Sequence, residues 1–343
     1  MSVNDFAADV NILVSVVMSV RNEGEFIRQA IDSVLNQTMA DFELLIVDDA
    51  SVDDTPEILK SYTDPRIKVY YNKTVKGIPT NCNFLMKMAK GKYIARFDGD
   101  DICRPDRLEK EISILEERQD IYLVCSNIRT FGELEEVRKT ECDFEKLKTK
   151  LILRNPIAQS TVMFRNDKTY YYDEWYSKSQ DYELWSQMMF DNKIFYVIDE
   201  ELVYYRIHTK QISRIKDGEE DIFTKRILAE NLSRICGNQP REIVANYARV
   251  IRREKNLSMQ AYFDACDMLK KIYKCSRHNQ LFDNYFLKKT VKEELIETVI
   301  LCGKTHGLWS VIIAIKYASM IRYDIFIRRI WTFLKGILKT NSR

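Results

Sequence analysis

Short apolar runs alternate with amphipathic stretches along the first part of the chain. Between the runs, apolar residues recur at the spacing of one helix face, as they do from Phe26 to Leu35. Strands and helices in alternation predict an α/β fold with a doubly wound, mostly parallel sheet and helices on both faces. The runs that predict strands lie at residues 12–18, 42–47, 67–71, 93–97 and 121–126.

The later part of the chain has a different pattern, which predicts a second region. Residues 143–207 are mixed, and from about residue 221 the pattern is helical, with Pro240 as its single proline. We therefore expect one domain over residues 1–215 and a helical C-terminal appendage over residues 216–343. Within the mixed part, helices are predicted at residues 144–154 and 181–190, and strands at 160–165, 194–198 and 202–207.

Charge and cysteine content argue against several classes of protein. Lys and Arg number 53 against 51 Asp and Glu, so no global field favours a nucleic-acid partner. The 8 cysteines include no C-x-x-C pair and the 3 histidines are scattered, which argues against a zinc site. Residues 1–11 lack the basic and apolar regions of a signal peptide. We expect a cytoplasmic protein with reduced thiols.

Polar side chains follow three of the predicted strands. Ser19, Arg21 and Asn22 come after the first strand, and Asp49 comes after the second. The acidic run at residues 98–101 comes after the fourth. In doubly wound sheets, ligands bind beyond the carboxyl ends of the strands. The sequence therefore predicts one binding site at this edge of the sheet.

The acidic run is a candidate metal site. Asp98, Asp100 and Asp101 place three like charges close together, which is unfavourable without compensation. Mg²⁺ or Mn²⁺ would relieve the repulsion, since these ions take one or two carboxylates together with phosphate oxygens. Gly99 is expected to let the backbone approach a ligand closely. The alternative is a solvated acidic turn.

Four segments, at residues 14–23, 33–38, 42–55 and 90–101, resemble family 2 glycosyltransferases with the GT-A fold. The resemblance covers about residues 12–212, with the motifs in the expected order. It implies a GT-A-like catalytic domain. Nucleotide-sugar binding is expected at about residues 12–130 and acceptor binding and catalysis at about 131–215.

The resemblance also implies roles for the residues at the strand ends. Ser19, Arg21, Asn22 and Asp49 would hold the nucleotide base and ribose. A carboxylate such as Asp49 can accept hydrogen bonds from a ring N–H and from ribose hydroxyls. An Asx-turn before Ser51 is the alternative reading of Asp49.

Further donor-site residues follow from the same resemblance. Asp98 would contact the ribose or the metal, and Asp100 would be the principal metal ligand. Arg96 is placed in the donor site, and Arg206 is expected to pair with phosphate. His208 is expected to bind the metal or the diphosphate, with a purely structural histidine as the alternative.

The segment Q-D-Y-E-L-W at residues 180–185 resembles the part of the family that supplies the general base. Inverting transfer needs a carboxylate that takes the proton of the acceptor hydroxyl, and Asp181 is assigned that role. Glu183 stays open as a second candidate, and a helix N-cap is the alternative function of Asp181. Residues 155–164 resemble the acceptor-lining segment, with Gln159 where many relatives carry His.

The end of the chain, residues 309–339, combines apolar stretches with basic and aromatic side chains. No stretch there reaches the roughly 20 apolar residues that a spanning helix needs. A basic amphipathic helix that lies in the membrane interface is expected instead, and a packing helix is the alternative.

These observations predict a metal-dependent, inverting glycosyltransferase. It would move a hexose, with glucose or galactose favoured, from a UDP-sugar to a saccharide acceptor. A sugar on a polyprenyl diphosphate at the inner face of the cell membrane is the expected acceptor, in O-antigen, capsule or exopolysaccharide assembly. A sugar nucleotidyltransferase would need a Gly-rich loop that residues 19–24 lack, and a processive synthase would need several spanning helices. A non-catalytic sugar-nucleotide-binding or scaffolding protein is the remaining alternative.

Overall fold

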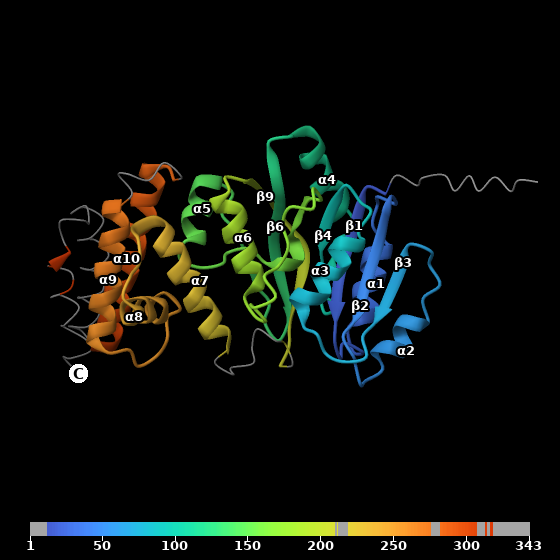
Figure 1. Cartoon of the computed structure of the whole chain (residues 1–343), viewed down its shortest axis with the longest axis horizontal. Helices are drawn as coiled ribbons and strands as arrows, with labels where there is room; N and C mark the ends of the chain where they lie inside the picture. Colours follow the sequence, from blue (N-terminus) through green and yellow to red (C-terminus); the bar gives the residue numbers. More distant parts are fainter. Residues whose placement is uncertain are drawn as a thin grey trace, which may run out of the picture. The chain divides into compact units, whose positions relative to one another are not determined.

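The computed structural model describes residues 12–209, 211, 219–275, 282–306, 313, 316 and 317 (Figure 1). The chain divides into two compact units, and each is described here by itself. The first unit combines Met1–Phe144 with Pro156–Lys216, and the second combines Glu145–Asn155 with Asp217–Arg343.

The elements of the first unit are β1 (Val14–Val20), α1 (Ile27–Leu35), β2 (Phe42–Asp48), α2 (Thr55–Lys60), β3 (Ile67–Tyr71), α3 (Ile78–Met88), β4 (Tyr93–Arg96), β5 (Ile102–Cys103), α4 (Arg107–Glu117), β6 (Ile121–Gly132), β7 (Val137–Arg138), η1 (Gln159–Thr161, a 3₁₀ turn), β8 (Met163–Arg165), α6 (Gln180–Phe190) and β9 (Ile194–Ile207).

The strands of the first unit form one mixed sheet in the order β3-β2-β1-β4-β8-β6-β9-β5, with β7 paired to β6. Strands β3, β2, β1 and β4 are parallel, and β6 and β9 are parallel over most of their length. The antiparallel pairs all involve one of the short strands β5, β7 and β8. Most of the paired length is therefore parallel, as the alternating sequence pattern predicts.

Helices cover both faces of this sheet. On one face, a buried cluster joins alternate residues of β1 and β2 to the apolar sides of α1, α2 and α4. On the other face, α3 packs on β1 and β2, and the Trp185 ring of α6 lies 6.3 Å from Phe164 of β8. This arrangement confirms the predicted α/β class. Because both faces are covered, the ends of the parallel strands are where polar side chains can gather.

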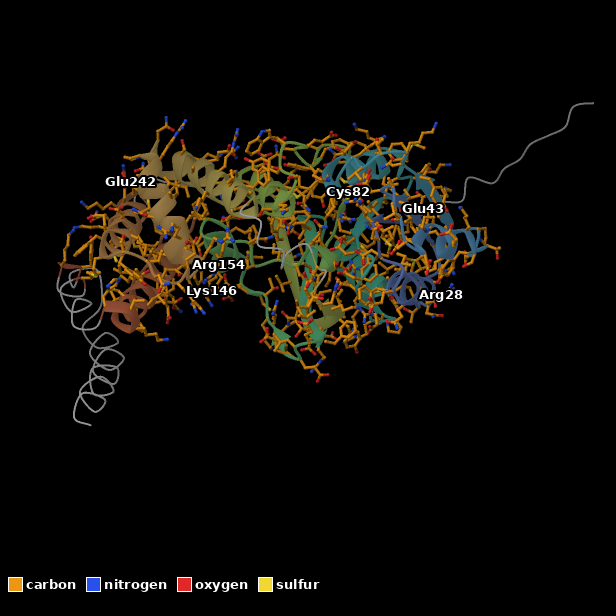
Figure 2. The ribbon with its side chains drawn as sticks, turned by 90° about the horizontal axis from the view of Figure 1, so that it is seen from below. Arg28, Glu43, Cys82, Lys146, Arg154 and Glu242 are labelled. Atoms are coloured by element: carbon orange, nitrogen blue, oxygen red, sulfur yellow. The ribbon has the colours of Figure 1, made fainter. Side chains whose placement is uncertain are left out.

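A buried glutamate fastens the first three strands to each other. Glu43 of β2 is 2% exposed and accepts from Ser15 Oγ of β1 and from Lys68 Nζ of β3, each at 2.7 Å. It also accepts from the Lys90 amide at 2.8 Å, just before the turn at Gly91. Figure 2 labels Glu43 among the side chains of this unit. These hydrogen bonds hold the strands in the register that aligns their polar ends.

The structure differs from the sequence prediction at the strands after residue 160. The strand predicted at 160–165 is the turn η1 followed by the shorter strand β8, and the two strands predicted at 194–198 and 202–207 are one strand, β9. Three acidic residues interrupt the apolar pattern there, and each has a partner, so the strand continues. Asp199 accepts a hydrogen bond from Asn127. Glu200 binds both Arg104 and Lys110, and Glu201 binds Arg129.

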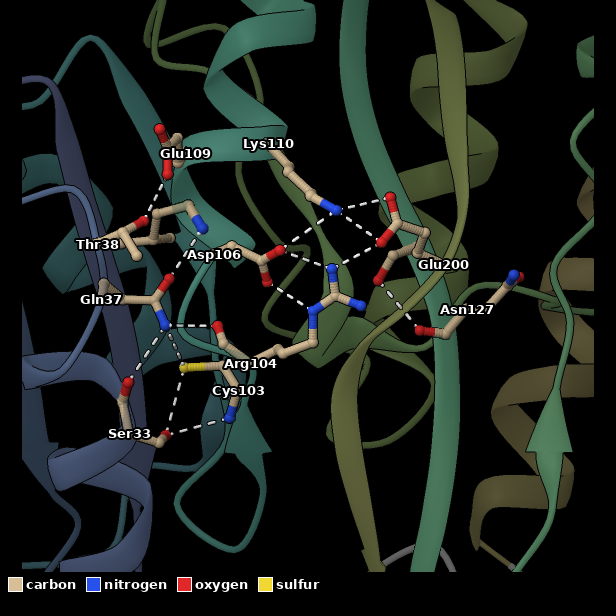
Figure 3. Close-up of polar contacts among 12 residues, drawn as sticks. Ser33, Gln37, Thr38, Cys103, Arg104, Asp106, Glu109, Lys110, Asn127 and Glu200 are labelled. Carbon is tan, nitrogen blue, oxygen red and sulfur yellow. Dashed lines mark hydrogen bonds and ion pairs between the residues drawn. The ribbon is translucent and has the colours of Figure 1, made fainter.

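Figure 3 shows how the β5–α4 turn is tied to its surroundings. Nη2 of Arg104 donates to Glu200 at 2.6 Å, and Lys110 Nζ reaches both oxygens of the same carboxylate. From the turn just after α1, Gln37 donates to the Arg104 carbonyl at 2.7 Å and accepts from the Leu108 amide at 2.9 Å. The segment that leaves the acidic run at residues 98–101 is therefore fixed to the turn after α1 and to β9.

Beneath the sheet lies a fully buried ion pair within α4. Arg107 Nε donates to Glu111 Oε1 at 3.0 Å, and the two side chains are 1% and 0% exposed. Arg107 also donates to the Arg96 carbonyl at 3.1 Å, at the end of β4. Among the described residues, none donates to the second oxygen of Glu111. Burial raises the pKa of Glu111 to about 7 although Arg107 acts to lower it.

The second unit is helical in its described parts. Within it, Thr149 and Thr290 share a hydrogen bond of 2.9 Å, and Arg154 pairs with Glu294. Figure 2 labels Lys146, Arg154 and Glu242 in this unit. Its first helix lies inside the stretch assigned by sequence to the catalytic domain, and the boundary near residue 215 stays a prediction. The elements are α5 (Phe144–Leu151), α7 (Glu219–Cys236), α8 (Arg241–Ile251), α9 (Met259–Cys275) and α10 (Asn284–His306).

The basic tail predicted at residues 309–339 lies outside the described residues except for Ile313, Lys316 and Tyr317. Ile313 and Tyr317 are 0% exposed, and the Tyr317 hydroxyl donates to Asp267 of α9 at 2.6 Å. The side chains of Ile313 and Tyr317 are thus packed within the second unit. None of the described helices is both long and apolar enough to cross a membrane.

The Glu111→Gln variant tests the buried pair through its pH dependence. The folded state binds this proton more tightly than the unfolded state, where the pKa is 4.5, so ionisation of Glu111 lowers stability. The wild type should lose about 3 kcal/mol of unfolding free energy between roughly pH 4.5 and pH 7 through this group. The variant should lack that loss. Urea unfolding at pH 5 and pH 8 measures it, with Glu117→Gln on exposed α4 surface as control. Equal pH dependence in wild type and Glu111→Gln would contradict the assignment.

Candidate active site

Two loops at the ends of β1 and β2 are bound to each other. The Asn22 amide donates to Ser51 Oγ, and the Val52 amide donates to Asn22 Oδ1, both at 2.9 Å. The Glu23 amide donates to Thr55 Oγ1 at 2.8 Å. Asn22 and Ala50 adopt left-handed φ angles of 58° and 56°, which a non-glycine residue holds only where its surroundings fix it. The structure therefore brings together two of the three predicted strand-end segments. Arg21 in the first loop is exposed.

Asp49 is held in a nest of N–H donors at the end of β2. Its Oδ1 accepts from Asn72 Nδ2 and from the Lys76 amide, and its Oδ2 accepts from the Gly77 amide, each at 2.8 Å. Burial acts to raise the pKa of Asp49, but these hydrogen bonds outweigh it and lower the pKa. Asp49 is therefore an ionised acceptor. A carboxylate has about four lone-pair sites, and these three hydrogen bonds use three of them.

The nest extends to Ser19 on β1. Asn72 Nδ2 also donates to Asn81 Oδ1 at 2.8 Å, and Asn81 Nδ2 donates to Ser19 Oγ at 3.1 Å. Sequence reasoning missed Asn72 and Asn81. Asn72 directly follows the strand Ile67–Tyr71, just as Asp49 follows β2, and that position was the available signal. Asn81 lies inside helix α3, where its sequence gives no such signal.

Both carboxylate oxygens of Asp98, beyond the end of β4, accept hydrogen bonds. Oδ1 accepts from Arg96 Nη2 at 3.2 Å and from Gln159 Nε2 at 3.1 Å, and Oδ2 accepts from Ser160 Oγ at 3.0 Å. The Asp98 side chain is 32% exposed, so it still faces solvent. Three donors on one carboxylate fix its orientation.

Arg96 has a different environment from the one predicted. It is 0% exposed, and it donates to Tyr172 Oη at 3.1 Å as well as to the Val17 carbonyl and to Asp98. A fully buried guanidinium with these partners is placed to orient Asp98, not to contact a nucleotide. Neighbouring charges raise the pKa of Arg96 although its burial alone would lower it.

Asp100 and His208 are in direct contact. Asp100 Oδ2 lies 3.1 Å from His208 Nε2, and the two side chains are 13% and 14% exposed. Burial, and then the charge of Asp98, raise the pKa of Asp100. Asp101 is 0% exposed, and burial together with the charges of Asp100 and Asp98 raises its pKa well above the usual range. The ionised forms of Asp100 and Asp101 are therefore unfavourable with the protein's own partners alone.

Arg206 packs between two rings instead of pointing freely to a ligand. Its guanidinium lies 4.7 Å from the Phe26 ring and 4.4 Å from the Phe131 ring. Nε donates to the Asp100 carbonyl at 2.7 Å and Nη2 to Gln29 at 2.6 Å. The Arg206 amide donates to Asp101 Oδ1 at 2.9 Å. In this structure, Arg206 thus holds the acidic loop on β9.

Gly99 serves packing, not the close approach to a ligand that its sequence position suggested. A Cβ at this position would lie 2.6 Å from Val20 Cγ1 and 3.2 Å from Ile27 Cδ1. The space that a side chain would need is therefore filled by β1 and α1. The glycine lets the acidic loop lie against the first strand.

Asp181 lies in the first turn of α6, and both Asp181 and Glu183 are half-buried. The preceding residue, Gln180, donates from Nε2 to Gln159 Oε1 at 3.4 Å. The charge of Asp181 is one of the influences that raise the pKa of Tyr172, which accepts a hydrogen bond from Arg96. The residue next to the predicted base is thus hydrogen-bonded to Gln159, which also binds Asp98. Tyr172 was not predicted as a site residue, whereas Ser160 lies in the segment that resembles the acceptor-lining part of the family.

The donor set fits a hard divalent cation in part. Among the described residues, no group of three or more His, Cys, Asp or Glu side chains is arranged to hold a metal ion without other ligands. Mg²⁺ and Mn²⁺ usually take only one or two protein ligands, together with waters and substrate phosphates. Asp100 and His208 supply such a pair, with Nε2 of His208 3.1 Å from Oδ2 of Asp100.

The comparisons with known proteins agree with this architecture. Residues 15–199 match Glycosyl transferase family 2, which is more than half of the chain. An uncharacterized glycosyltransferase of Methanocaldococcus jannaschii is 33% identical over 239 residues, which cover 66% of this chain and 82% of the relative. The fold and the family match together define a GT-A-like glycosyltransferase. The chain belongs to glycosyltransferase family 2.

Other relatives carry more specific names. The O-antigen biosynthesis glycosyltransferase WbnJ of Escherichia coli is 33% identical over 219 residues, covering 59% of this chain and 82% of WbnJ. The UDP-Glc:alpha-D-GlcNAc-diphosphoundecaprenol beta-1,3-glucosyltransferase WfgD of Escherichia coli is 32% identical over 182 residues, covering 53% and 72%. The crystal structure of S. aureus TarS in complex with UDP has a TM-score of 0.54 at 16% identity, over 83% of this chain and 88% of that chain. This last likeness concerns the fold.

Proposed function

We propose that this glycosyltransferase is an inverting enzyme that moves a hexose from a UDP-sugar to a saccharide acceptor. The observation that supports it best is the grouping of Asp49, Asp98 and Asp100 at the ends of β2 and β4, with hydrogen bonds from Asp98 through Gln159 to the helix of Asp181. Such an arrangement offers a nucleotide-binding carboxylate, a phosphate-side acidic pair and a base in one unit. Glucose or galactose is the favoured sugar.

The nucleoside part of the donor would bind at the Asp49 nest. Three N–H groups hold Asp49 in one orientation, and a donor group of the nucleoside would bind to its Oδ2. The ring N–H of uracil is such a group. Ser19 and the loop with Arg21 and Asn22 border this position and would contact the rest of the nucleoside.

Asp100 and His208 would hold Mn²⁺ or Mg²⁺ beside the diphosphate, with Asp98 oriented next to them by Arg96 and Ser160. The bound ion supplies charge neutralisation for the departing diphosphate. Arg206 keeps the acidic loop in place through the Asp100 carbonyl and the Asp101 carboxylate. We therefore assign Arg96 and Arg206 positioning roles, in place of the direct nucleotide and phosphate contacts expected from sequence.

Asp181 would take the proton of the acceptor hydroxyl while that oxygen attacks the anomeric carbon from the face opposite the diphosphate. Inversion follows from this geometry, because the base and the leaving group lie on opposite sides of the sugar. The first turn of α6 suits a carboxylate, since the helix dipole stabilises negative charge there.

The acceptor proposed is a sugar carried on a polyprenyl diphosphate in surface-polysaccharide assembly, at the inner face of the cell membrane. The names of the relatives WbnJ and WfgD support this substrate class. The basic and aromatic residues between 309 and 339 would favour an anionic membrane surface, as the sequence predicts.

A donor screen tests the class of reaction. Purified protein with Mn²⁺ should slowly release UDP from one UDP-sugar, and EDTA or Asp100→Ala should abolish the release, because the diphosphate charge is then uncompensated. Released nucleotide is the readout across a panel of UDP- and other nucleotide sugars. Release from no donor, even with a lipid-diphosphate sugar present, would contradict the proposal and favour a non-catalytic binding protein.

The Asp181→Asn variant tests the identity of the base. It should lower the transfer rate by roughly 10²–10⁴, the usual contribution of a general base, while UDP-sugar binding by calorimetry stays near the wild-type value. Glu183→Gln, a matched change in the same helical turn, should transfer at close to the wild-type rate. The opposite order of the two variants would assign the base to Glu183.

A further inference from the structure

Gln159 connects the carboxylate at the end of β4 to the helix that carries Asp181. Its Nε2 donates to Asp98 Oδ1 at 3.1 Å, and its Oε1 accepts from Gln180 Nε2 at 3.4 Å. Gln180 is the first residue of α6 and is 7% exposed. A continuous chain of hydrogen bonds therefore joins Asp98 to the residue next to Asp181.

The hydrogen bonds of this chain run in one direction. Gln159 turns its NH₂ group toward Asp98 and its carbonyl toward Gln180 of α6. That carbonyl in turn requires a donor, which the Gln180 amide supplies. Ser160 binds the second oxygen of Asp98 at 3.0 Å, so the turn η1 is attached to this carboxylate at two points.

The start of α6 depends on such tertiary contacts. Ser179, directly before the helix, has a left-handed φ of 56°. A non-glycine residue keeps this unfavourable conformation only where its surroundings determine it. The buried Gln180 side chain is one of the groups that fix the first helical turn in place.

We infer that Gln159 and Gln180 form an amide relay that positions Asp181 relative to Asp98. Both glutamines are positioning residues, since they act through the carboxylates at the two ends of the relay. The catalytic consequence rests on the proposed function. The relay keeps Asp181, the proposed base, at a fixed position relative to Asp98 in the proposed sugar-nucleotide site. A change at either end is then transmitted to the other.

The test compares Gln159→Ala, Gln180→Ala and the double variant with wild type. Gln187→Ala, on the exposed side of the same helix, is the matched control. Each single relay variant should lower kcat for transfer about tenfold, while the Kd for the UDP-sugar changes less than about threefold, as expected for loss of one hydrogen bond in a charged network. The double variant should be no slower than the slower single variant, because both changes break the same chain. Amide hydrogen exchange in the first turn of α6 should become faster in all three.

The outcomes separate the relay from the proposed function. Transfer losses that multiply in the double variant, or wild-type exchange rates at the first turn of α6, would overturn the relay while transfer by the wild type still supports the function. A wild type without transfer activity whose α6 exchange responds to Gln159→Ala would overturn the proposed function and keep the relay. The Gln187→Ala control should match wild type in every measurement, and an equal effect there would also overturn the relay.

Discussion

The site depends on one buried cation, the guanidinium of Arg96. It joins the backbone of β1 at Val17 to Asp98 beyond the end of β4, and it also binds Tyr172. A buried charge is costly unless its hydrogen bonds are satisfied. Loss of any of these partners would therefore leave the buried guanidinium with an unsatisfied donor. Arg107 adds a second buried cation that donates to the Arg96 carbonyl and pairs with Glu111. Two buried guanidinium groups, those of Arg96 and Arg107, therefore lie next to the acidic edge of the sheet.

Hydrogen bonds from several elements explain how these carboxylates can share one edge of a sheet. Asp49 and Asp98 each have three donors, and both are held as oriented acceptors. Asp100 and Asp101 have fewer, and their raised pKa values mark the part of the site where ionised carboxylates are unfavourable. A site of this kind suits a ligand that brings its own cation and phosphates.

The parts of the site that sequence could predict are those set by local pattern. The strand Ile67–Tyr71 has the predicted bounds, and Asp49 and the residues after β4 were predicted because parallel strands end at one edge. The hydrogen bonds from Gln159 and Ser160 to Asp98 could not be predicted in this way. It depends on β8 entering antiparallel between β4 and β6, which brings η1 beside Asp98. Likewise, the sequence predicts that Arg206 binds phosphate, whereas in the structure its guanidinium packs between the rings of Phe26 and Phe131.

The central claim is that the ends of β2 and β4 form one donor site, with Asp49 on the nucleoside side and Asp100 with His208 on the diphosphate side. A crystal structure of the protein with UDP and Mn²⁺ tests it most directly. We predict density for the uracil ring with its N–H on Oδ2 of Asp49, and an anomalous manganese peak beside Asp100 and His208. Nucleotide density elsewhere on the protein, or bound UDP that leaves Asp49 and Asp100 without contacts, would contradict the account.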